Sequence, residues 1–501
     1  MQIIIVKNTK IDGIYVHFMH ILHNFAEKVL SSMKSLDEIL AISDISTKIS
    51  DLKNRSFPSH LWEVLVKDYE PRFHGIVTDK QGRKDKVHSD SSIDKAARLT
   101  VGLEKLLVKR ITEFTFAIPP KREYSNTDNE TRQQIAKAIE QIYQAAHINA
   151  ENIKRGIAYY ASCEIFTMWY AVEKPNDLYG FHSDVKLKCK TFSPMDCCLL
   201  YPLMDEMGDM LAMSFEYEVK VSNKQTTTYF ETFTEDHHYK WKRDGDNGTW
   251  EEVHKPEPIS ILKIPGSYLW RPEPVFQGLQ PIREDIEYTL SRNSDIVAYN
   301  SAPVLKVAGT LVGDIKKGET RRVYRVEQGG DVSYVSWAQS IDSLKYHIDS
   351  LLKLYWMQAQ MPDISFENMK SLGNIGYDSR RTLLTDAHLK IGEESGPWLE
   401  FLDRECNVIK AFLKKMKPQW ASEIDNVEVK HIITPFIIED EQAQIDMHMK
   451  ANGGQAVESL RESIQRIGKS KNVDETIKQI QEEAVMKSSL ASSLVDMFSE
   501  E

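Results

Sequence analysis

The octapeptide GDIKKGET at Gly313–Thr320 has the glycine spacing of a loop that binds nucleotide phosphates. Such a loop requires a lysine directly after its second glycine, because the lysine ammonium group reaches the β- and γ-phosphates. This chain carries Glu319 at that position, and a carboxylate there repels the phosphates. We therefore interpret the segment as a β-turn between short strands, and the sequence predicts no nucleotide cofactor.

Histidines occur in two groups that could bind zinc, but neither has the spacing of an established zinc motif. The segment HFMHILH places His17, His20 and His23 three residues apart, which suits one face of a helix. It lacks the glutamate of the H-E-x-x-H motif and a nearby cysteine pair. His237 and His238 are adjacent beside a predicted hairpin. We interpret both groups as surface histidines.

Thiols and carboxylates give one candidate group each. Cys197 and Cys198 are adjacent, but two neighbouring thiols alone do not form a tetrahedral metal site, and buried cysteines commonly act as small hydrophobic residues. The segment MDEMGDM groups Asp205, Glu206 and Asp209 in an apolar setting, where they could hold a metal ion. We favour a solvated loop for this segment. The sequence thus predicts no catalytic residue and no bound metal.

A basic group lies between two predicted helices of this otherwise acidic chain. It could contact nucleic acid or an acidic partner. It could equally be the solvated face of a hairpin, and the sequence does not choose between these two interpretations. The group consists of Lys316, Lys317, Arg321, Arg322 and Arg325.

The charge balance limits the classes of function. The 501-residue chain has a net charge of −11, from 63 Lys and Arg and 74 Asp and Glu. Tight binding of nucleic acid through its phosphates needs a basic balance, so this class is disfavoured. The five cysteines are odd in number and lack disulfide spacing, which favours a reducing compartment. The N-terminus MQIIIVKNTK does not have the pattern of a signal peptide, and no apolar run approaches the ~20 residues of a membrane span.

The N-terminal half combines helices with an antiparallel meander. The chain is predicted to be mainly helical to about Pro119. One helix there has Ser92 as its N-cap, and its apolar face consists of Leu99, Leu103, Leu106 and Leu107. Alternating segments such as SFEYEVKVS and TTTYFETFTED follow, and YKWKRDGDNGTWEEV has the pattern of a hairpin. These segments predict a meander at about 213–265.

Two longer helices enclose the basic group. The first covers 281–300, where a proline suits the first helical turn. The second runs from Ser340 to Gln360 and would span roughly 30 Å. Its apolar face, which we expect to pack against the first helix, consists of Ile341, Leu344, Ile348, Leu351 and Tyr355. A glycine-bearing break, a helix at about 381–417 and a polar helical tail follow.

The order of these elements resembles that of the portal proteins of tailed double-stranded DNA bacteriophages, particularly those of crAss-like phages. The segments that carry the resemblance lie mainly between 281 and 413. They are SRNSDIVAYNSAPVLKVAG, VEQGGDVSYVSW, SIDSLKYHIDSLLKLYWMQAQMPDISFENM, LLTDAHLKIGEESGPWLEFLDRECNVIKAFL and, near the C-terminus, VDETIKQIQEE.

The resemblance implies an α+β, mainly α, ring-forming portal fold with wing, stem, clip and crown regions. It also implies a tunnel loop that faces DNA, with the candidates Lys370, Ser371, Asn374 and Tyr377. Many portals carry a Ser-Gly pair there, whereas this chain has SLGNIGYDSRRTLL. The implied regions are 1–280 wing, 281–300 stem helix, 301–339 clip, 340–361 stem helix, 362–445 tunnel loop and wing helix, and 446–501 crown.

A portal of this kind is a dodecameric ring at one capsid vertex and is not an enzyme. Double-stranded DNA passes through its channel during packaging and ejection. The implied partners are the major capsid protein, the terminase large subunit, which supplies ATP hydrolysis, and head–tail adaptor proteins. The implied location is the virion, with the host cytoplasm during assembly, and the basic group would lie in the clip, where partners dock. The alternatives are another head–tail structural protein and a DNA-processing enzyme with dispersed carboxylates.

Overall fold

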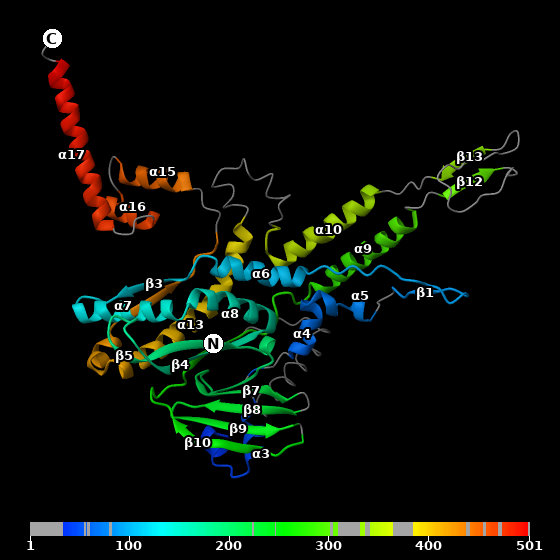
Figure 1. The fold of residues 1–501 in the computed structure, drawn as a ribbon, viewed down its shortest axis with the longest axis horizontal. Coiled ribbons are helices and arrows are strands. Elements are labelled where there is room, and N and C mark those ends of the chain that lie inside the picture. The colour runs from blue at the N-terminus through cyan, green and yellow to red at the C-terminus, as the bar shows by residue number, and fades with distance from the viewer. Residues whose placement is uncertain are drawn as a thin grey trace, which may run out of the picture. The chain divides into compact units, whose positions relative to one another are not determined.

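The structure is a computed structural model of the chain. The residues that it describes are 34–54, 57, 61–79, 83–222, 225–245, 247–300, 304–308, 331–335, 341–363, 384–436, 441–453, 457–468 and 473–498. They form a mixed α+β fold (Figure 1), as the sequence predicts. The chain divides into two compact units. Unit 1 comprises Met1–Met361 and Lys390–Pro435, and unit 2 comprises Pro362–Leu389 and Phe436–Glu501.

The described strands all belong to unit 1. They are β1 (Lys86–Val87), β2 (Ile93–Asp94), β3 (Lys121–Ser125), β4 (Glu164–Asn176), β5 (Ser183–Phe192), β6 (Leu199–Met204), β7 (Met210–Ser222), β8 (Gln225–Phe233), β9 (His237–Asp244), β10 (Glu251–Pro258), β11 (Gly266–Trp270), β12 (Val304–Ala308), β13 (Asp331–Val335) and β14 (Glu428–Ile432).

The described helices follow the same numbering. They are α2 (Leu36–Leu40), α3 (Ile45–Leu52), α4 (Trp62–Tyr69), α5 (Gly75–Thr78), α6 (Leu103–Phe116), α7 (Glu130–Ala145), α8 (Ile148–Ser162), α9 (Gln280–Asn300), α10 (Ile341–Ala359), α13 (Thr385–Met416), α14 (Ala421–Ile424), α15 (Glu441–Asn452), α16 (Leu460–Ile467) and α17 (Val473–Phe498), with short 3-10 turns at Pro71–Phe73, Pro194–Asp196 and Pro418–Trp420. Among the described residues, no helix is both long and apolar enough to cross a membrane.

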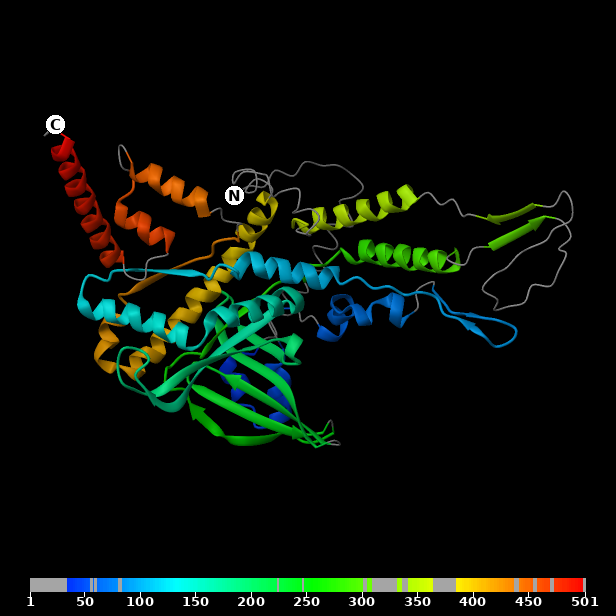
Figure 2. The same cartoon turned by 45° about the horizontal axis from the view of Figure 1, so that its top comes forward.

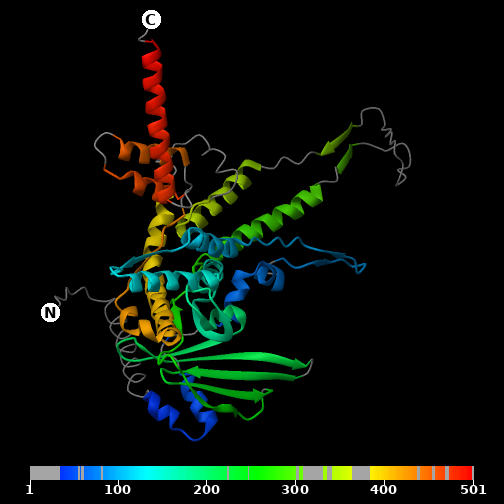
Figure 3. The same ribbon diagram turned by 60° about the vertical axis from the view of Figure 1, so that its left-hand side comes forward.

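A five-stranded antiparallel sheet has the strand order β10-β9-β8-β7-β6. Successive side chains of a strand point to opposite faces, and both faces of this sheet carry apolar residues. Phe215 and Phe233 face a core shared with the three-stranded sheet β11-β4-β5. Phe230 and Trp241 face the other core, where α2 and α3 (dark blue in Figure 3) cover the sheet. The predicted meander is therefore buried on both faces over part of its length.

A third core forms on the opposite face of β4 and β5. Trp169 and Leu187 leave these strands on that face and meet buried residues of α7 and of the long helix α13. Helices α6 and α8 pack unusually closely beside this layer. A Cβ atom added at Gly156 of α8 would lie 2.8 Å from Thr112 Cγ2 on α6, so glycine is required at this contact.

The predicted helix with Ser92 as its N-cap is wrong in its first third. Helix α6 begins only at Leu103, and Ile93 instead pairs with Val87 in the β1–β2 hairpin. Ser91 has a left-handed φ of 65°, and the Ser92 backbone N–H donates to the Asp90 side chain. The residues between the hairpin and α6 have no helical assignment, and their backbone donors bond to side chains elsewhere.

Unit 2 contains α15, α16 and α17. Helix α15 packs against α16, and α16 packs against α17. Ser459 caps α16 in a capping box with Glu462, and Gly468 ends the helix with a left-handed φ of 68°. His448 and Glu458 are both buried, and His448 Nδ1 lies 2.9 Å from Glu458 Oε2.

Candidate functional site: the α9–α10 helix pair and its anchor

Helices α9 and α10 lie side by side and run in opposite directions (Figure 1 and Figure 2). With 21 and 19 residues, each extends about 30 Å at 1.5 Å per residue. The strands β12 and β13 lie in the segment between them and pair antiparallel, from Val304 opposite Val335 to Ala308 opposite Asp331. The segment between the two helices therefore contains a small two-stranded sheet.

The apolar face of α10 becomes more buried toward the end of the helix. Leu344, Ile348 and Leu351 are half-buried, whereas Tyr355 is fully buried. Tyr355 also packs edge-on against Trp356, with ring centroids 5.5 Å apart. The structure thus brings these four predicted residues onto one packed face. The burial of the Ile341 side chain lies outside what the structure describes.

A row of polar side chains on α9, four residues apart, faces the segment that precedes α6. This row, the α9 polar ladder, consists of Arg283, Glu287, Ser291 and Asp295. Residues at this spacing share one face of a helix. The sequence interpretation above missed the ladder, because α9 carries many other polar residues and the four-residue repeat does not stand out among them.

Three members of the ladder accept hydrogen bonds from alternate backbone N–H groups. The Val101 N–H donates to Glu287 Oε1 at 2.9 Å, the Leu99 N–H to Ser291 Oγ at 2.8 Å, and the Ala97 N–H to Asp295 Oδ1 at 2.8 Å. The two spacings match, because two extended residues span about 6.6 Å and four helical residues span about 6.0 Å. The segment before α6 is therefore held straight along α9.

The fourth member of the ladder, Arg283, is the centre of a buried charge cluster. Its guanidinium group is 1% exposed and bonds to Glu104 on α6 at 3.0 Å, to Asp68 on α4 at 2.9 Å, and to Glu287 at 3.3 Å. His74 also contributes, since its Nδ1 lies 2.5 Å from Glu287 Oε1 and its Nε2 lies 2.9 Å from the Asp68 carbonyl oxygen. One arginine thus joins α9 to two other helices.

Burial and charge act in opposite directions on the pKa values of this cluster. Desolvation raises the pKa of the Glu104 carboxyl, although the nearby guanidinium group of Arg283 opposes the shift. Desolvation alone would lower the pKa of Arg283, but Glu104 and Glu287 outweigh it and raise that pKa. Burial raises the pKa of Tyr355 on α10, and the charge of Glu104 adds to this shift. The start of α9, the end of α10 and α6 therefore share one electrostatic environment.

Two predicted sets of functional residues lie outside the described residues. These are the basic group Lys316, Lys317, Arg321, Arg322 and Arg325 and the tunnel-loop candidates Lys370, Ser371, Asn374 and Tyr377. The histidines His17, His20 and His23 also lie outside them.

The remaining candidates have ordinary local roles in the structure. Asp205 accepts hydrogen bonds from the backbone N–H groups of Met207 and Asp209, both at 2.8 Å, so the acidic segment closes a turn on itself. Cys197 is exposed and Cys198 is buried, and burial raises the pKa of the Cys198 thiol. Neither cysteine forms a disulfide.

Comparison with known proteins places these observations in a family. The family described as "Phage portal protein, SPP1 Gp6-like" matches residues 66–489. Among solved structures, the chain is similar to one titled "Neck of empty GTA particle computed with C6 symmetry", with 11% sequence identity, a TM-score of 0.39, and coverage of 72% of this chain and 89% of that chain. A TM-score at this level does not establish a shared fold. No curated protein matches the chain.

Proposed function

This chain belongs to the SPP1 Gp6-like phage portal protein family, and from that premise we propose how its parts form a portal of the crAss-like phage type. A portal protein is a structural protein of the virion, not an enzyme, and it forms an oligomeric ring at the capsid vertex where head and tail connect. What is proposed beyond this is the size of the ring, its regions, and the surfaces that meet DNA and partners.

The proposed ring is a dodecamer whose channel carries double-stranded DNA during packaging and ejection. Charge supports this role, because twelve copies at −11 each carry about −130 in total, and an acidic lining keeps DNA from binding tightly as it moves. The terminase large subunit and the head–tail adaptor dock on the ring in turn, and the major capsid protein surrounds it. ATP hydrolysis belongs to the terminase.

The proposed regions follow the order of the elements. Helices α9 and α10 form the stem, β12 and β13 belong to the clip, and α16, α17 and the part of α15 from residue 446 onward form the crown. The elements before α9 form the wing. In residue numbers, the regions are 1–280 wing, 281–300 stem, 301–339 clip, 340–361 stem, 362–445 tunnel loop and wing helix, and 446–501 crown.

The observation that carries the proposal is the α9–α10 pair fixed on a buried charge cluster. A ring subunit needs long helices that stand at one set angle around a channel. The α9 polar ladder fixes that angle, since a change of angle would take Arg283 away from Glu104 on α6 and Asp68 on α4 and leave Glu104 buried without a partner. The same pair exposes large apolar side chains, with Tyr346 77% and Met357 68% exposed. Neighbouring subunits would cover such side chains in a ring.

The proposal is tested first by the mass of the purified assembly. Native mass spectrometry and electron microscopy of the full chain should give a closed ring of twelve copies. A ring of another size would correct the stoichiometry alone, whereas a monomer or dimer at micromolar concentration would contradict the portal role. The assembly should not hydrolyse ATP unless the terminase is added.

Clip docking is tested by charge reversal of Lys316, Lys317, Arg321 and Arg322 to glutamate. Rings should form normally, and docking of the terminase should weaken most at low salt, because rim charges act mainly on association rate. The matched control reverses four exposed lysines of the proposed wing, namely Lys109, Lys137, Lys174 and Lys188. If both variants dock like the unmodified ring at every salt concentration, the basic group has no role in docking.

A further inference from the structure

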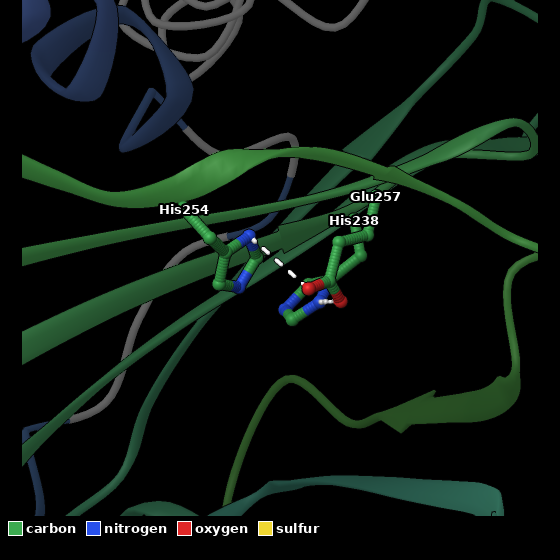
Figure 4. A group of neighbouring side chains, drawn as sticks. All are labelled: His238, His254 and Glu257. Carbon is green, nitrogen blue, oxygen red and sulfur yellow. Dashed lines mark ion pairs between the residues drawn. The ribbon is translucent and has the colours of Figure 1, made fainter.

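Two histidines and a glutamate converge on the outer part of the five-stranded sheet (Figure 4). They are His238 on β9 and His254 and Glu257 on β10. One ligand atom from each side chain can be chosen so that all three atoms lie within 4.8 Å of one another. His238 Nδ1 lies 3.8 Å from Glu257 Oε2, and His254 Nδ1 lies 3.7 Å from Glu257 Oε1. None of these three residues belongs to the α9 polar ladder.

Irregular strand pairing brings these side chains together. Glu257 is directly opposite His238 in the β9–β10 register, so this pair is a cross-strand neighbour. On a regular strand, His254 would point to the opposite face from Glu257, because the two residues are three apart and side chains alternate between the faces. The register shifts between Glu252 and His254 and again between His254 and Glu257. Such irregularities re-aim side chains, and here they turn both β10 residues toward His238.

His238 is held with its Nδ1 atom turned toward the other two groups. Its Nε2 lies 2.9 Å from Glu231 Oε2 on β8, and Glu231 also accepts a hydrogen bond from the Tyr217 hydroxyl at 2.6 Å. An ionised carboxylate only accepts hydrogen bonds, so Nε2 carries the proton and the neutral ring has its lone pair on Nδ1. The His238 ring also stacks on Phe233, with centroids 4.2 Å apart. This is the carboxylate–histidine arrangement that orients a metal-binding imidazole.

We propose that His238, His254 and Glu257 bind one zinc ion per chain, with water completing the coordination. Two imidazoles and one carboxylate are a ligand set that zinc accepts, with bonds of about 2.0–2.2 Å. Tetrahedral bonds of this length separate neighbouring ligand atoms by about 3.3 Å. His238 Nδ1 and Glu257 Oε2 lie 3.8 Å apart and need to approach only slightly, and one atom from each of the three side chains lies within 4.8 Å of the others. His254 Nδ1 also lies 2.9 Å from the Lys255 carbonyl oxygen, which would orient its ring for coordination through the other nitrogen.

The zinc ion would fasten an edge strand to its sheet. Strand β10 is at the end of the sheet order and is exposed along most of its length. Exposed edge strands are weakly held and can pair with other chains. A metal that joins β9 to β10 would resist that separation, and because the unfolded chain lacks the site, zinc would stabilise the folded chain in proportion to its binding.

The proposal is tested by zinc binding to the purified, metal-stripped full chain. Equilibrium dialysis against zinc chloride, with elemental analysis, should give one zinc ion per chain that depends on the cluster. The variants His254→Ala and Glu257→Gln change exposed or half-exposed side chains and should fold normally. Each should weaken that binding at least tenfold. His238 is left unchanged, because its ring also supports Phe233 and Glu231.

Two controls separate this site from other zinc ligands of the chain. His237→Ala removes the neighbouring histidine on the opposite face of β9 and should leave binding unchanged. Triple replacement of His17, His20 and His23 by alanine should also leave the cluster-dependent zinc in place. Cobalt in place of zinc should show no thiolate charge-transfer band, since the proposed ligands include no cysteine. Equal zinc binding in His254→Ala, Glu257→Gln and the unmodified chain would overturn the proposal and leave the cluster as a set of ion pairs.

Discussion

Replacing Arg283 by methionine should destabilise the chain by about 3–5 kcal/mol at pH 8, the usual cost of breaking a buried ion pair by removing one partner. Methionine keeps much of the arginine side-chain volume but removes the guanidinium group. Glu287 would keep His74 and the Val101 N–H as partners. Glu104, which is fully buried, would lose the arginine that bonds to its Oε1 atom. Most of the cost therefore comes from Glu104.

The loss of stability in Arg283→Met should be larger at high pH than at low pH. Burial already raises the pKa of Glu104 in the folded chain, and Arg283 is the main group that opposes this shift. In Arg283→Met, the folded-state pKa rises further, so the folded chain holds a proton that the unfolded chain releases above about pH 4.3. A group of this kind favours the folded state below the unfolded pKa, and that contribution is lost as pH rises through the folded pKa. The variant should therefore lose less stability at pH 5 than at pH 8.

Urea unfolding of the unassembled chain, followed by tryptophan fluorescence at both pH values, measures this effect. The double variant Arg283→Met with Glu104→Gln should recover part of the loss at pH 8, because the glutamine carries no charge to desolvate. Arg132→Met is a matched control, since the Arg132–Glu423 pair is partly exposed and should contribute only about 0–1 kcal/mol. A loss in Arg283→Met that is the same at both pH values, and that Glu104→Gln does not reduce, would refute this account of the cluster.

Three further predictions concern packing and reactivity. Leu344→Ala and Leu351→Ala each remove a half-buried side chain and should lower the free energy of unfolding by about 1–3 kcal/mol, at the low end for such truncations. The double variant should fail to form rings in electron micrographs. Normal rings would contradict the packing of α10. Trp398→Ala removes a fully buried ring that packs against Phe116 and should cost about 3–5 kcal/mol in urea unfolding, whereas the exposed Met207→Ala should cost under about 0.5 kcal/mol. Iodoacetamide should label the exposed Cys197 before the buried cysteines, as peptide mass spectrometry would show.

Periodic patterns of apolar residues predicted the mixed α+β class and the two long helices. In α10, apolar residues at three- and four-residue spacing mark the packed side, and Tyr355 at the end of this face is fully buried. In the meander, alternation located the strands, but it failed toward the end of β7. Alternation in the segment SFEYEVKVS places Val219 on the same face as the buried Phe215, yet Val219 is 41% exposed, so the strand extends past the core. Pattern alone does not reveal where a core ends.

The cluster of His238, His254 and Glu257 was only half visible in the sequence. His238 was noted with its neighbour His237, but the side chains that face it are His254 and Glu257, on another strand. The two histidines are separated by a turn and by an irregular register that no short motif encodes. The sequence therefore led to the interpretation of His237 and His238 as surface histidines, without the neighbours that His238 has on β10. Cross-strand proximity, not sequence proximity, creates this group.

The error at Ser92 and the missed α9 polar ladder have one physical cause. The segment before α6 has enough helix-forming residues to predict a helix, but its backbone donors at Ala97, Leu99 and Val101 bond to side chains of α9. A backbone N–H that is already satisfied in this way is not available to a helix, so a tertiary contact overrides local propensity. The polar ladder of α9 faces this segment. The hydrogen bonds that keep this segment extended therefore also hold α9, a helix of the proposed stem. A variant that removes them should loosen both the segment and the helix.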